Sequence, residues 1–536
     1  MSELSTADHD RSPPTVNVPR HYNAAFDLIE RNLAAGRGAG IAYIDDAGRC
    51  SYAELAERTA RFANGLLARG FEPEQRVLLC MHDTIDLPVA FLGAIRAGLV
   101  PIPVNTLLTP DDFAFMLEDS RAALAVVSAA FLPVFEPLLE RLPRLRGLVV
   151  AGAPADDPRS LAHLLAMAGG DAHYAATTSD DACFWLYSSG STGRPKGTVH
   201  VHSSPIHTAE LYARPHLGLD ATDVVYSAPK LFFAYGLGNA LTFPLAAGAT
   251  TILMAERPTP ASVFARLRTH RPTVFYGVPT LYAAMLASPE LPQAGELRLR
   301  RCVSAGEPLP EDIGRRWSRR FGVDILDGIG STEMLHIFLS NVPGDVRYGT
   351  TGRPVPGYAV RLLDESGRPV APGEIGELQV SGPTSAAMYW NNRDKSRHTF
   401  EGPWTRTGDK FTLGPDGRYV YAGRSDDMLK VSGIYVSPAE VEAALISHPA
   451  VLEAAVVGRA DSDGLLKPAA YVVLRPGIAG NAELAGELRQ HVKALLAPYK
   501  YPRWIEFIGE LPKTATGKIQ RFRLRSSANP LPAAGQ

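Results

Sequence analysis

Apolar and polar positions alternate along residues 40–180 in a way that predicts helices and strands in turn. In SYAELAERTARFANGLLARG (residues 51–70) apolar side chains recur three and four positions apart, with Ser51 suited to the N-cap and Gly70 to the end of a helix. The short apolar run QRVLLCM then predicts a strand, and the strand–helix–strand order recurs through residues 99–129. Such alternation is typical of α/β layers with mostly parallel strands.

The same pattern returns in VVYSAPK, TTILMAE, TVFYGVP and DILDGIG. These apolar runs end in turns that contain glycine or proline, where ligands bind in open α/β sheets. After residue 350 the alternation of RPVPGYAVRLLDESGRPVAPGEIGELQVSG predicts a smaller β-rich subdomain, and from VSPAEVEAALISHPAVLEAAVVG onward a helix–strand pattern resumes.

The predicted fold class is therefore α/β, with a large N-terminal domain of layered α/β subdomains plus a small β-rich subdomain, and a small C-terminal α+β domain. We place the boundary in a polar turn after residue 425. The expected divisions are a disordered tail, the N-terminal domain, the C-terminal domain and a second disordered tail, over residues 1–20, 21–425, 426–526 and 527–536.

Composition places the chain among globular enzymes. Of its 536 residues 46% are apolar and 21% are charged, and the formal net charge is −2 without a long run of one sign, so we expect neither nucleic acid nor a membrane surface as a partner. The apolar stretch of residues 87–104 is broken by Arg96 and two prolines and is too short to span a bilayer. Four widely spaced cysteines and a polar N-terminus without an apolar core indicate a cytoplasmic protein with reduced thiols.

The loop YSSGSTGRPKGTVH (residues 187–200) concentrates glycines and hydroxyl side chains around Lys196. Glycines let the backbone approach a ligand closely, and hydroxyl, amide and ammonium donors favour an anion. The lysine precedes its glycine, so the loop does not match the P-loop pattern. An ordinary solvated turn is the alternative reading, but the preceding apolar run ACFWLY predicts a buried strand, and a glycine-rich turn directly after such a strand favours a functional loop.

This loop resembles the signature of the adenylate-forming enzymes, which include acyl-CoA synthetases, adenylation domains and luciferases. The stretches GIGSTE, TGD, YAGRSDDMLKVSGIYVSPAEVE and PKTATGKIQR resemble later motifs of the same family in the same order, and together they cover residues 25–525. The resemblance implies that ATP activates a carboxylate as an acyl-adenylate with release of pyrophosphate. In the acyl-CoA synthetases the acyl group then passes to the thiol of coenzyme A.

Three residues carry the implied chemistry. Lys518 would be catalytic, because a cation between two approaching oxyanions offsets their repulsion. Taken alone it would be an ordinary surface lysine, as we expect for Lys513 in the same stretch. Thr332 would donate a hydrogen bond to the α-phosphate, and Glu333 would be the protein ligand of Mg²⁺, which prefers carboxylate and phosphate oxygens. Acetylation of Lys518 would remove its charge and is a possible control of activity.

The resemblance also assigns the nucleotide site. Asp409 and Arg424 would bind the ribose, and the backbone around Gly306 would pass along the adenine. Many relatives carry an aromatic residue at the position of Ile329, so plain apolar contact replaces stacking here. The implied ATP-binding residues are Ser188, Ser189, Gly190, Ser191, Thr192, Gly193, Lys196, Gly306, Glu307, Pro308, Asp327, Gly328, Ile329, Thr332, Asp409 and Arg424.

The second half-reaction needs a path for the thiol. In the family the C-terminal domain is a mobile lid that rotates about an aspartate, here Asp426. After rotation the implied coenzyme A contacts are Lys430, Ser432 and Gly433. The sequence does not determine the oligomeric state, and a homodimer is one alternative.

The acid is indicated by FFAYGLGN and GSTEMLHIF, which resemble the benzoate-CoA ligases. By that resemblance Tyr235 closes a flat apolar slot suited to an aromatic carboxylate, and His336 is a neutral part of its wall. From the pattern alone, the first stretch would be a core helix. The implied acid-binding residues are Phe233, Ala234, Tyr235, Gly236, Gly330, His336 and Ile337.

We expect benzoate as the acid, with ATP, Mg²⁺ and coenzyme A as cofactors and co-substrates. Three alternatives share the fold or the chemistry: a ligase for hydroxy- or aminobenzoate, a stand-alone aryl acid adenylation enzyme that loads a carrier protein, and a luciferase-like oxygenase. A non-catalytic nucleotide-binding regulator is disfavoured, because both Lys518 and Glu333 are present.

Overall fold

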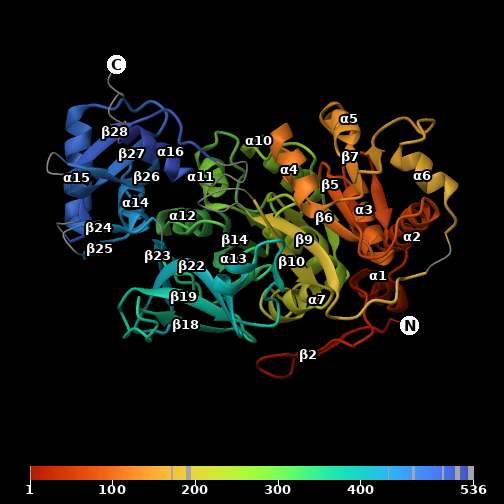
Figure 1. Ribbon diagram of the computed structural model, residues 1–536. Helices are drawn as coiled ribbons and strands as arrows, with labels where there is room; N and C mark the ends of the chain where they lie inside the picture. Colours follow the sequence, from red (N-terminus) through yellow and green to blue (C-terminus); the bar gives the residue numbers. More distant parts are fainter. Residues whose placement is uncertain are drawn as a thin grey trace, which may run out of the picture.

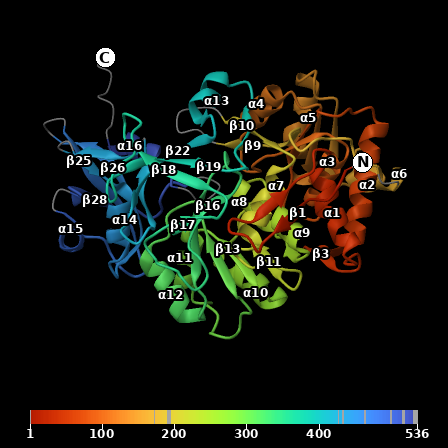
Figure 2. The ribbon, with the colours of Figure 1, turned by 90° about the horizontal axis from the view of Figure 1, so that it is seen from below.

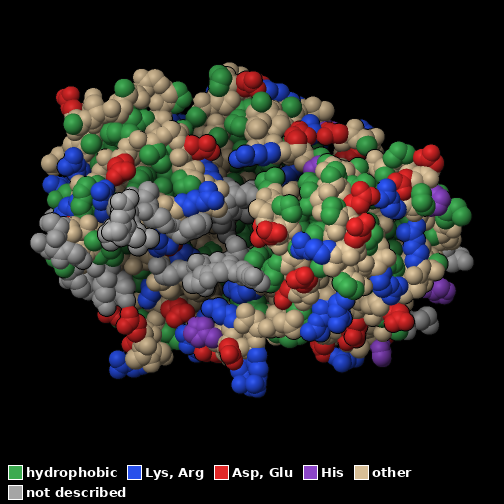
Figure 3. Space-filling view, turned by 45° about the horizontal axis from the view of Figure 1, so that its top comes forward, with side chains coloured by type: hydrophobic (Ala, Val, Ile, Leu, Met, Phe, Trp, Pro, Cys, Tyr) green, Lys and Arg blue, Asp and Glu red, His purple; other side chains and the backbone are tan. Residues whose placement is uncertain are grey.

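The computed structural model describes residues 2–170, 173–188, 195–425, 427–431, 434–461, 465–497, 500–513 and 519–528. Figure 1 shows the order of the layers, from the first parallel sheet at the right to the C-terminal elements at the left. Basic and acidic side chains are interspersed over the face drawn in Figure 3. Of the helices in the described part of the chain, none has the length and apolar character needed to cross a membrane.

The first layer is a four-stranded parallel sheet of order β6-β5-β7-β8. Its helices begin where the sequence predicts them: Ser51 caps the helix that follows it, its side chain and that of Glu54 each accepting from the other's backbone N–H. The strands are β5 (Arg76–Cys80), β6 (Val100–Pro103), β7 (Leu124–Ser128) and β8 (Gly147–Ala151). The helices and the short 3₁₀ turn are α2 (Tyr52–Ala68), α3 (Asp86–Arg96), α4 (Pro110–Ser120), η1 (Ala129–Phe131), α5 (Leu132–Arg141) and α6 (Leu161–Met167).

The second layer is a nine-stranded sheet of order β17-β16-β15-β14-β13-β11-β12-β3-β4, parallel from β15 to β3. Its parallel strands are β3 (Ile41–Ile44), β11 (Val224–Ser227), β12 (Thr250–Ile252), β13 (Val274–Gly277), β14 (Arg301–Ser304) and β15 (Ile325–Gly330). Antiparallel strands at its edges are β4 (Arg49–Ser51), β16 (Ile337–Ser340) and β17 (Arg353–Pro354).

Successive side chains of these strands point to opposite faces, and each face packs on its own helices. Tyr226 and Phe275 contribute to a core with α10 (Pro260–His270), α11 (Pro279–Ala287) and α12 (Glu311–Phe321), which line one side of the sheet in Figure 2. Val225 and Tyr276 contribute to the large core on the other face. That face carries two helices with π-helical segments: α7 (Ser204–Thr208) with η2 (Ala209–Ala213), and α8 (Ala234–Leu237) with η3 (Gly238–Thr242) and α9 (Phe243–Ala247).

Three smaller sheets and two two-stranded antiparallel pairs complete the described part of the molecule. The first has the order β20-β10-β9, the β-rich subdomain is a five-stranded antiparallel sheet, and the C-terminal sheet has the order β26-β27-β28. Their strands are β9 (Ala182–Ser188), β10 (Lys196–Val201), β20 (Met388–Tyr389), β18 (Ala359–Leu363), β19 (Gly376–Ser381), β21 (Phe400–Glu401), β22 (Trp404–Leu413), β23 (Tyr419–Arg424), β26 (Val451–Ala460), β27 (Leu466–Leu474) and β28 (Trp504–Phe507). The remaining elements are α13 (Arg393–Thr399), β24 (Leu429–Val431), β25 (Ile434–Val436), α14 (Pro438–Ile446), α15 (Ala482–Leu495) and α16 (Arg521–Ala528).

The N-terminal segment departs from the expectation of a disordered tail over residues 1–20. Strands β1 (Thr6–Asp8) and β2 (Thr15–Asn17) form an antiparallel hairpin before α1 (Ala24–Ala34). The hairpin is held because Ser5 hydrogen-bonds buried Asp27 of α1 and His9 pairs with Glu210. The polar composition of this segment indicated disorder, but its few polar side chains meet partners from distant parts of the chain.

Gly93 tests the packing of the first layer. A Cβ at this position of α3 would lie 2.6 Å from Cδ1 of Phe62 on α2. We expect Gly93→Ala to lower the free energy of unfolding by about 1–3 kcal/mol, because the two helices would have to separate. Urea unfolding of the full chain measures the change.

Gly486 is the matched control, because it also lies inside a helix but a Cβ there would meet nothing within 4 Å. Gly486→Ala should stabilise its helix by roughly 0.5–1 kcal/mol through the reduced entropy of the unfolded chain. Equal changes in the free energy of unfolding for the two substitutions would show that close packing against Phe62 does not determine the effect of Gly93→Ala.

Candidate active site

The predicted nucleotide end of the site lies where β14 ends beside the middle of β15. Ser304 and Asp327 are paired positions of the two parallel strands, and Oγ of Ser304 and Oδ1 of Asp327 are buried without a hydrogen-bond partner. Burial raises the pKa of Asp327 well above its ordinary value, although the Leu309 N–H opposes the shift. A buried polar atom of this kind requires a partner, and an amino group such as that of adenine would supply a donor.

The predicted adenine segment follows directly. Gly306 has φ +95°, in the left-handed region that favours glycine, so the chain turns sharply between β14 and α12. Glu307 accepts the backbone N–H of Ile519 at 3.3 Å, which brings the C-terminal part of the chain against this segment. Half-buried Ile329 lies on β15 opposite Leu339, with Gly328 beside it.

Thr332 and Glu333 occupy the turn between β15 and β16. The Glu333 carboxylate accepts the Tyr389 hydroxyl at 2.7 Å and the Ser188 hydroxyl at 3.4 Å through the same oxygen, Oε1. Its backbone carbonyl accepts the N–H of Ala386 at 2.8 Å. Two segments thus orient this carboxylate, those of Ser188 and Tyr389, and the segment of Tyr389 also binds its backbone through Ala386.

Lys196 and His200, both on β10, approach the same turn. The Lys196 ammonium lies 4.5 Å from the centre of the Tyr389 ring, and burial lowers the pKa of Lys196 although Glu333 opposes the shift. His200 Nε2 lies 2.8 Å from the carbonyl oxygen of Thr332. That oxygen only accepts, so Nε2 carries the proton, and burial lowers the pKa of His200 to about 4.

The ribose end of the predicted site lies on β22 and β23. Asp409 is buried, and its carboxylate accepts Arg424 NH1 at 3.1 Å. Arg424 also donates to the carbonyl oxygen of Thr407 at 3.2 Å. The structure therefore brings together these two residues, which are 15 positions apart, as paired positions of two antiparallel strands.

The predicted acid pocket lies between the nine-stranded sheet and the helices that carry π-helical segments. His336, at the start of β16, is buried with ring centres 5.5 Å from Tyr235, 5.7 Å from Tyr212 and 4.4 Å from Phe243. Gly238 allows this packing, because a Cβ there would lie 2.3 Å from Cδ2 of His336. The wall is thus aromatic on three sides.

His336 is neutral and has one defined tautomer. Its Nε2 lies 3.1 Å from Oδ1 of Asn239 and 3.3 Å from the carbonyl oxygen of Tyr235, both acceptors in this arrangement, so Nε2 is protonated. Burial lowers the pKa of His336 to about 3, which keeps the ring uncharged at neutral pH. The pocket is therefore suited to an uncharged ring.

The other acid-site residues lie along the same elements. Phe233 and the first residues of α8, Ala234 and Gly236, precede η3, while Gly330 ends β15 and Ile337 begins β16. The acid-site residues and the phosphate-site residues therefore share the β15–β16 connection.

Several predicted residues cannot be located. Of Lys430 only the backbone, in β24, is described. Tyr187 and Ser188 end β9, residues 196–200 lie in β10, and Pro308 lies in the connection between β14 and α12. The residues outside the described ranges are Ser189, Gly190, Ser191, Thr192, Gly193, Asp426, Ser432, Gly433 and Lys518.

Sequence reasoning missed three positioning residues. Asn239 holds the ring of His336, His200 holds the backbone of Thr332, and Tyr389 holds Glu333. Asn239 is a polar residue in an apolar helical stretch and His200 follows the glycine-rich loop, so both carried a local signal. Tyr389 carried none, because only the pairing of β10 with β20 brings it to the site.

The donors present are compatible with magnesium. No group of three or more His, Cys, Asp or Glu side chains that could hold a metal ion occurs among the described residues. Mg²⁺ is commonly bound by one or two carboxylates together with substrate phosphates and waters. The carboxylate of Glu333, with the Ser188 hydroxyl beside it, fits that pattern.

Comparison with known proteins identifies the family. Residues 30–390 match the AMP-binding enzyme model and residues 440–518 match the AMP-binding enzyme C-terminal domain. The chain belongs to the AMP-binding enzyme family, and the predicted family and fold class are confirmed.

Similar proteins act on aromatic acids. The chain is 64% identical to a benzoate–CoA ligase of Thauera aromatica, over 98% of this chain and 100% of that protein. It is 53% identical to a 4-hydroxybenzoate–CoA/benzoate–CoA ligase of Rhodopseudomonas palustris, over 94% of each chain. Among solved structures, a benzoate CoA ligase from Burkholderia xenovorans is similar with a TM-score of 0.89 and 56% identity, covering 94% of this chain and 100% of that one.

Buried neutral histidines predict a stability that depends on pH. The pKa values of His200 and His202 are lowered by burial to about 4, and that of His336 to about 3. An unfolded histidine has a pKa near 6.5, so between these values the unfolded chain binds protons that the folded chain does not. We expect the free energy of unfolding to fall from pH 7.5 to pH 5.5, by on the order of 1 kcal/mol per histidine, as measured by urea unfolding.

His336→Gln is the informative variant. It removes one of these buried histidines, so its stability should change less between the two pH values than that of the original chain. An unchanged pH dependence would contradict the neutral state assigned to His336.

Proposed function

We propose that this protein is a benzoate–CoA ligase, which converts benzoate, ATP and coenzyme A into benzoyl-CoA, AMP and pyrophosphate through an enzyme-bound benzoyl-adenylate. The observation that carries the proposal is the buried, uncharged aromatic wall of Tyr235, His336 and Phe243. This wall is connected by one short turn to Thr332 and Glu333. A flat apolar ring fits such a wall, while its carboxylate extends toward the phosphate site.

In the first half-reaction, a carboxylate oxygen of the acid attacks the α-phosphorus of ATP and pyrophosphate leaves. The Thr332 hydroxyl orients the α-phosphate, and the hydrogen bond from His200 to its backbone sets its position. Lys196 supplies positive charge toward the departing phosphates, and its lowered pKa reflects the cost of holding that charge in a half-buried place. Lys518 would lie between the carboxylate and the α-phosphate.

Glu333 would hold Mg²⁺, which neutralises charge on the phosphates when bound. Tyr389 and Ser188 keep the Glu333 carboxylate oriented, because both hydroxyls donate to the same oxygen. Asp409 and Arg424 would bind the ribose hydroxyls, and Asp327 the adenine amino group.

In the second half-reaction, the thiol of coenzyme A attacks the acyl carbon and AMP leaves. We propose that the C-terminal domain, from residue 426 to 526, turns about Asp426 between the two steps. The hydrogen bond from the Ile519 N–H to Glu307 holds the described end of this domain against the predicted adenine segment, which supports its assignment to the first step. After the turn, Lys430, Ser432 and Gly433 would contact the pantetheine arm.

The substrate is tested by a panel of acids. We expect AMP formation that depends on coenzyme A to be fastest with benzoate, because a neutral aromatic wall accepts a flat ring. Hydroxy- and aminobenzoates should be slower, although one added hydroxyl is discriminated only weakly by an apolar pocket, by on the order of 100-fold or less. Preference for octanoate would overturn the pocket assignment, and AMP formation without transfer to coenzyme A would indicate a carrier-loading enzyme.

Lys518→Ala separates the half-reactions. It should reduce adenylate formation by about a hundredfold to a thousandfold, since one charge that stabilises the transition state is lost. Thioester formation from supplied benzoyl-adenylate should remain close to that of the original chain. The two rates are measured by pyrophosphate release and by benzoyl-CoA formation.

Lys513→Ala is the control in the same segment, because Lys513 pairs with Glu453 at 2.7 Å on the C-terminal sheet. It should leave both half-reactions nearly intact. An equal loss of both half-reactions in Lys518→Ala would refute the role given to Lys518.

A further inference from the structure

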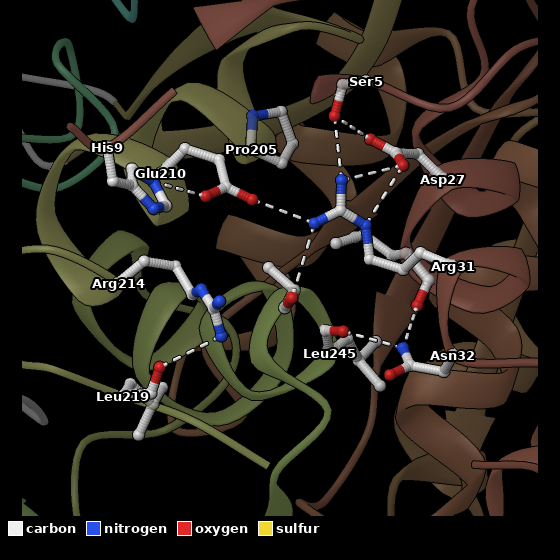
Figure 4. A network of polar contacts seen from close by, with 12 residues as sticks. Ser5, His9, Asp27, Arg31, Asn32, Pro205, Glu210, Arg214, Leu219 and Leu245 are labelled. Carbon is white, nitrogen blue, oxygen red and sulfur yellow. Dashed lines mark hydrogen bonds and ion pairs between the residues drawn. The ribbon is translucent and has the colours of Figure 1, made fainter. Parts of the chain in front are cut away.

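Residues of the N-terminal segment join α1 and η2 in a buried cluster of polar and charged side chains (Figure 4). Arg31 of α1 donates to Asp27 at 2.9 Å and to Glu210 of η2 at 2.9 Å. Ser5 bridges this cluster by accepting from Arg31 at 2.8 Å and donating to Asp27 at 2.6 Å. His9 reaches the other oxygen of Glu210 at 3.0 Å. We call Ser5, His9, Asp27, Arg31 and Glu210 the N-terminal clamp.

The clamp sets one guanidinium, that of Arg31, between two buried carboxylates, those of Asp27 and Glu210. The Asp27 and Glu210 side chains are 0% and 7% exposed, and the Arg31 side chain is 15% exposed. Burial lowers the pKa of Arg31, but Asp27 and Glu210 outweigh it, so the net shift is upward. Buried charges persist only when paired, so loss of one partner leaves another uncompensated. The geometry of the three residues is therefore tightly constrained.

Arg31 contacts both helices that carry π-helical segments. It pairs with Glu210 on η2, and it donates to the backbone carbonyl of Ala246 on α9 at 3.4 Å. Its neighbour Asn32 donates to the carbonyl oxygen of Leu245 on α9 at 2.8 Å. Helix α1 thus fixes the separation between the helix that ends in η2 and the helix that runs from α8 to α9.

These two helices also form the wall of the acid pocket. Glu210 and Tyr212 are two residues apart on the π-helical segment η2, so their side chains lie on nearly opposite sides of the helix. Glu210 faces the clamp, and Tyr212 faces His336, at 5.7 Å between ring centres, with its hydroxyl 3.5 Å from Oγ of Ser340. On the other helix, Tyr235 and Asn239 contact His336. A rotation of η2 at Glu210 would therefore move Tyr212 against the pocket wall.

We propose that the N-terminal clamp positions the aromatic acid pocket: Glu210, held by Arg31 and closed off by Ser5 and His9, sets the rotation of η2 and so the placement of Tyr212 beside His336. The proposal rests on the proposed aromatic acid–CoA ligase activity. None of the clamp residues is among the predicted acid-binding or ATP-binding residues, so we assign them a positioning role. They act on binding and selection of the acid without a direct effect on ATP or coenzyme A.

The main test is Glu210→Gln in the full chain, which keeps the size of the side chain and removes its charge. We expect the KM for benzoate to rise roughly fivefold to thirtyfold, as a perturbation of one or two kcal/mol at the pocket would produce. The preference for benzoate over 4-hydroxybenzoate should weaken, while the KM values for ATP and coenzyme A stay unchanged. Steady-state AMP formation at varied concentrations of each substrate gives the three constants.

A second variant keeps the proposal testable if Glu210→Gln does not fold. Ser5→Ala combined with His9→Ala keeps the buried pair of Arg31 and Glu210, and it should raise the KM for benzoate in the same direction by a smaller factor. Glu57→Gln is the control: it removes an exposed ion pair with Arg61 on α2, at 2.9 Å, and should change no KM.

The outcomes separate the alternatives. A similar rise in all three KM values would show general loosening and overturn the proposal, as would an unchanged KM for benzoate in both clamp variants. If the original chain turns over another acid instead of benzoate, the proposed substrate fails. The clamp variants are then tested with that acid. The proposal stands if the KM for the acid rises while the KM for ATP stays unchanged, and it falls otherwise.

Discussion

The connection between β15 and β16 is the constraint on which the site depends. β15 pairs with parallel β14 on one side and with antiparallel β16 on the other, so a single short turn lies between the adenine end and the acid end. Thr332 and Glu333 lie in this turn, and His336 directly after it. In the proposed reaction, a carboxylate at the acid wall and a phosphate at this turn would therefore lie close together, as formation of an acyl-adenylate requires.

The candidate site also contains buried histidines that carry no charge. His200 and His336 are both buried and both donate from Nε2 to an acceptor, so each ring is oriented by a hydrogen bond while remaining neutral. A protonated ring at either place would carry an unpaired charge in a low-dielectric interior, which is costly. The positive charges of the site instead lie on Lys196 and Arg424, which are only half-buried or exposed and face carboxylates.

Local patterns were sufficient for much of the fold. The helix predicted over residues 51–70 is α2 with its Ser51 cap, and the apolar run after it is β5, because helix capping and periodic burial depend on neighbouring residues alone. The N-terminal hairpin was predicted wrongly as disordered. Its polar residues find partners on α1 and η2, more than twenty and two hundred positions away, and no local rule contains such contacts.

The sequence by itself determined the family and the fold class, and it predicted the residues of the candidate site, because these rest on short motifs with local spacing. Only the tertiary structure decided which side chains hydrogen-bond to the site residues and hold the site's helices in place. Tyr389 reaches Glu333 through the pairing of β10 with β20, and Arg31 ties α1 to both helices of the acid wall. The physical reason is that a buried polar group must find a partner wherever the chain brings one, and that position is set by the packing of whole sheets and helices.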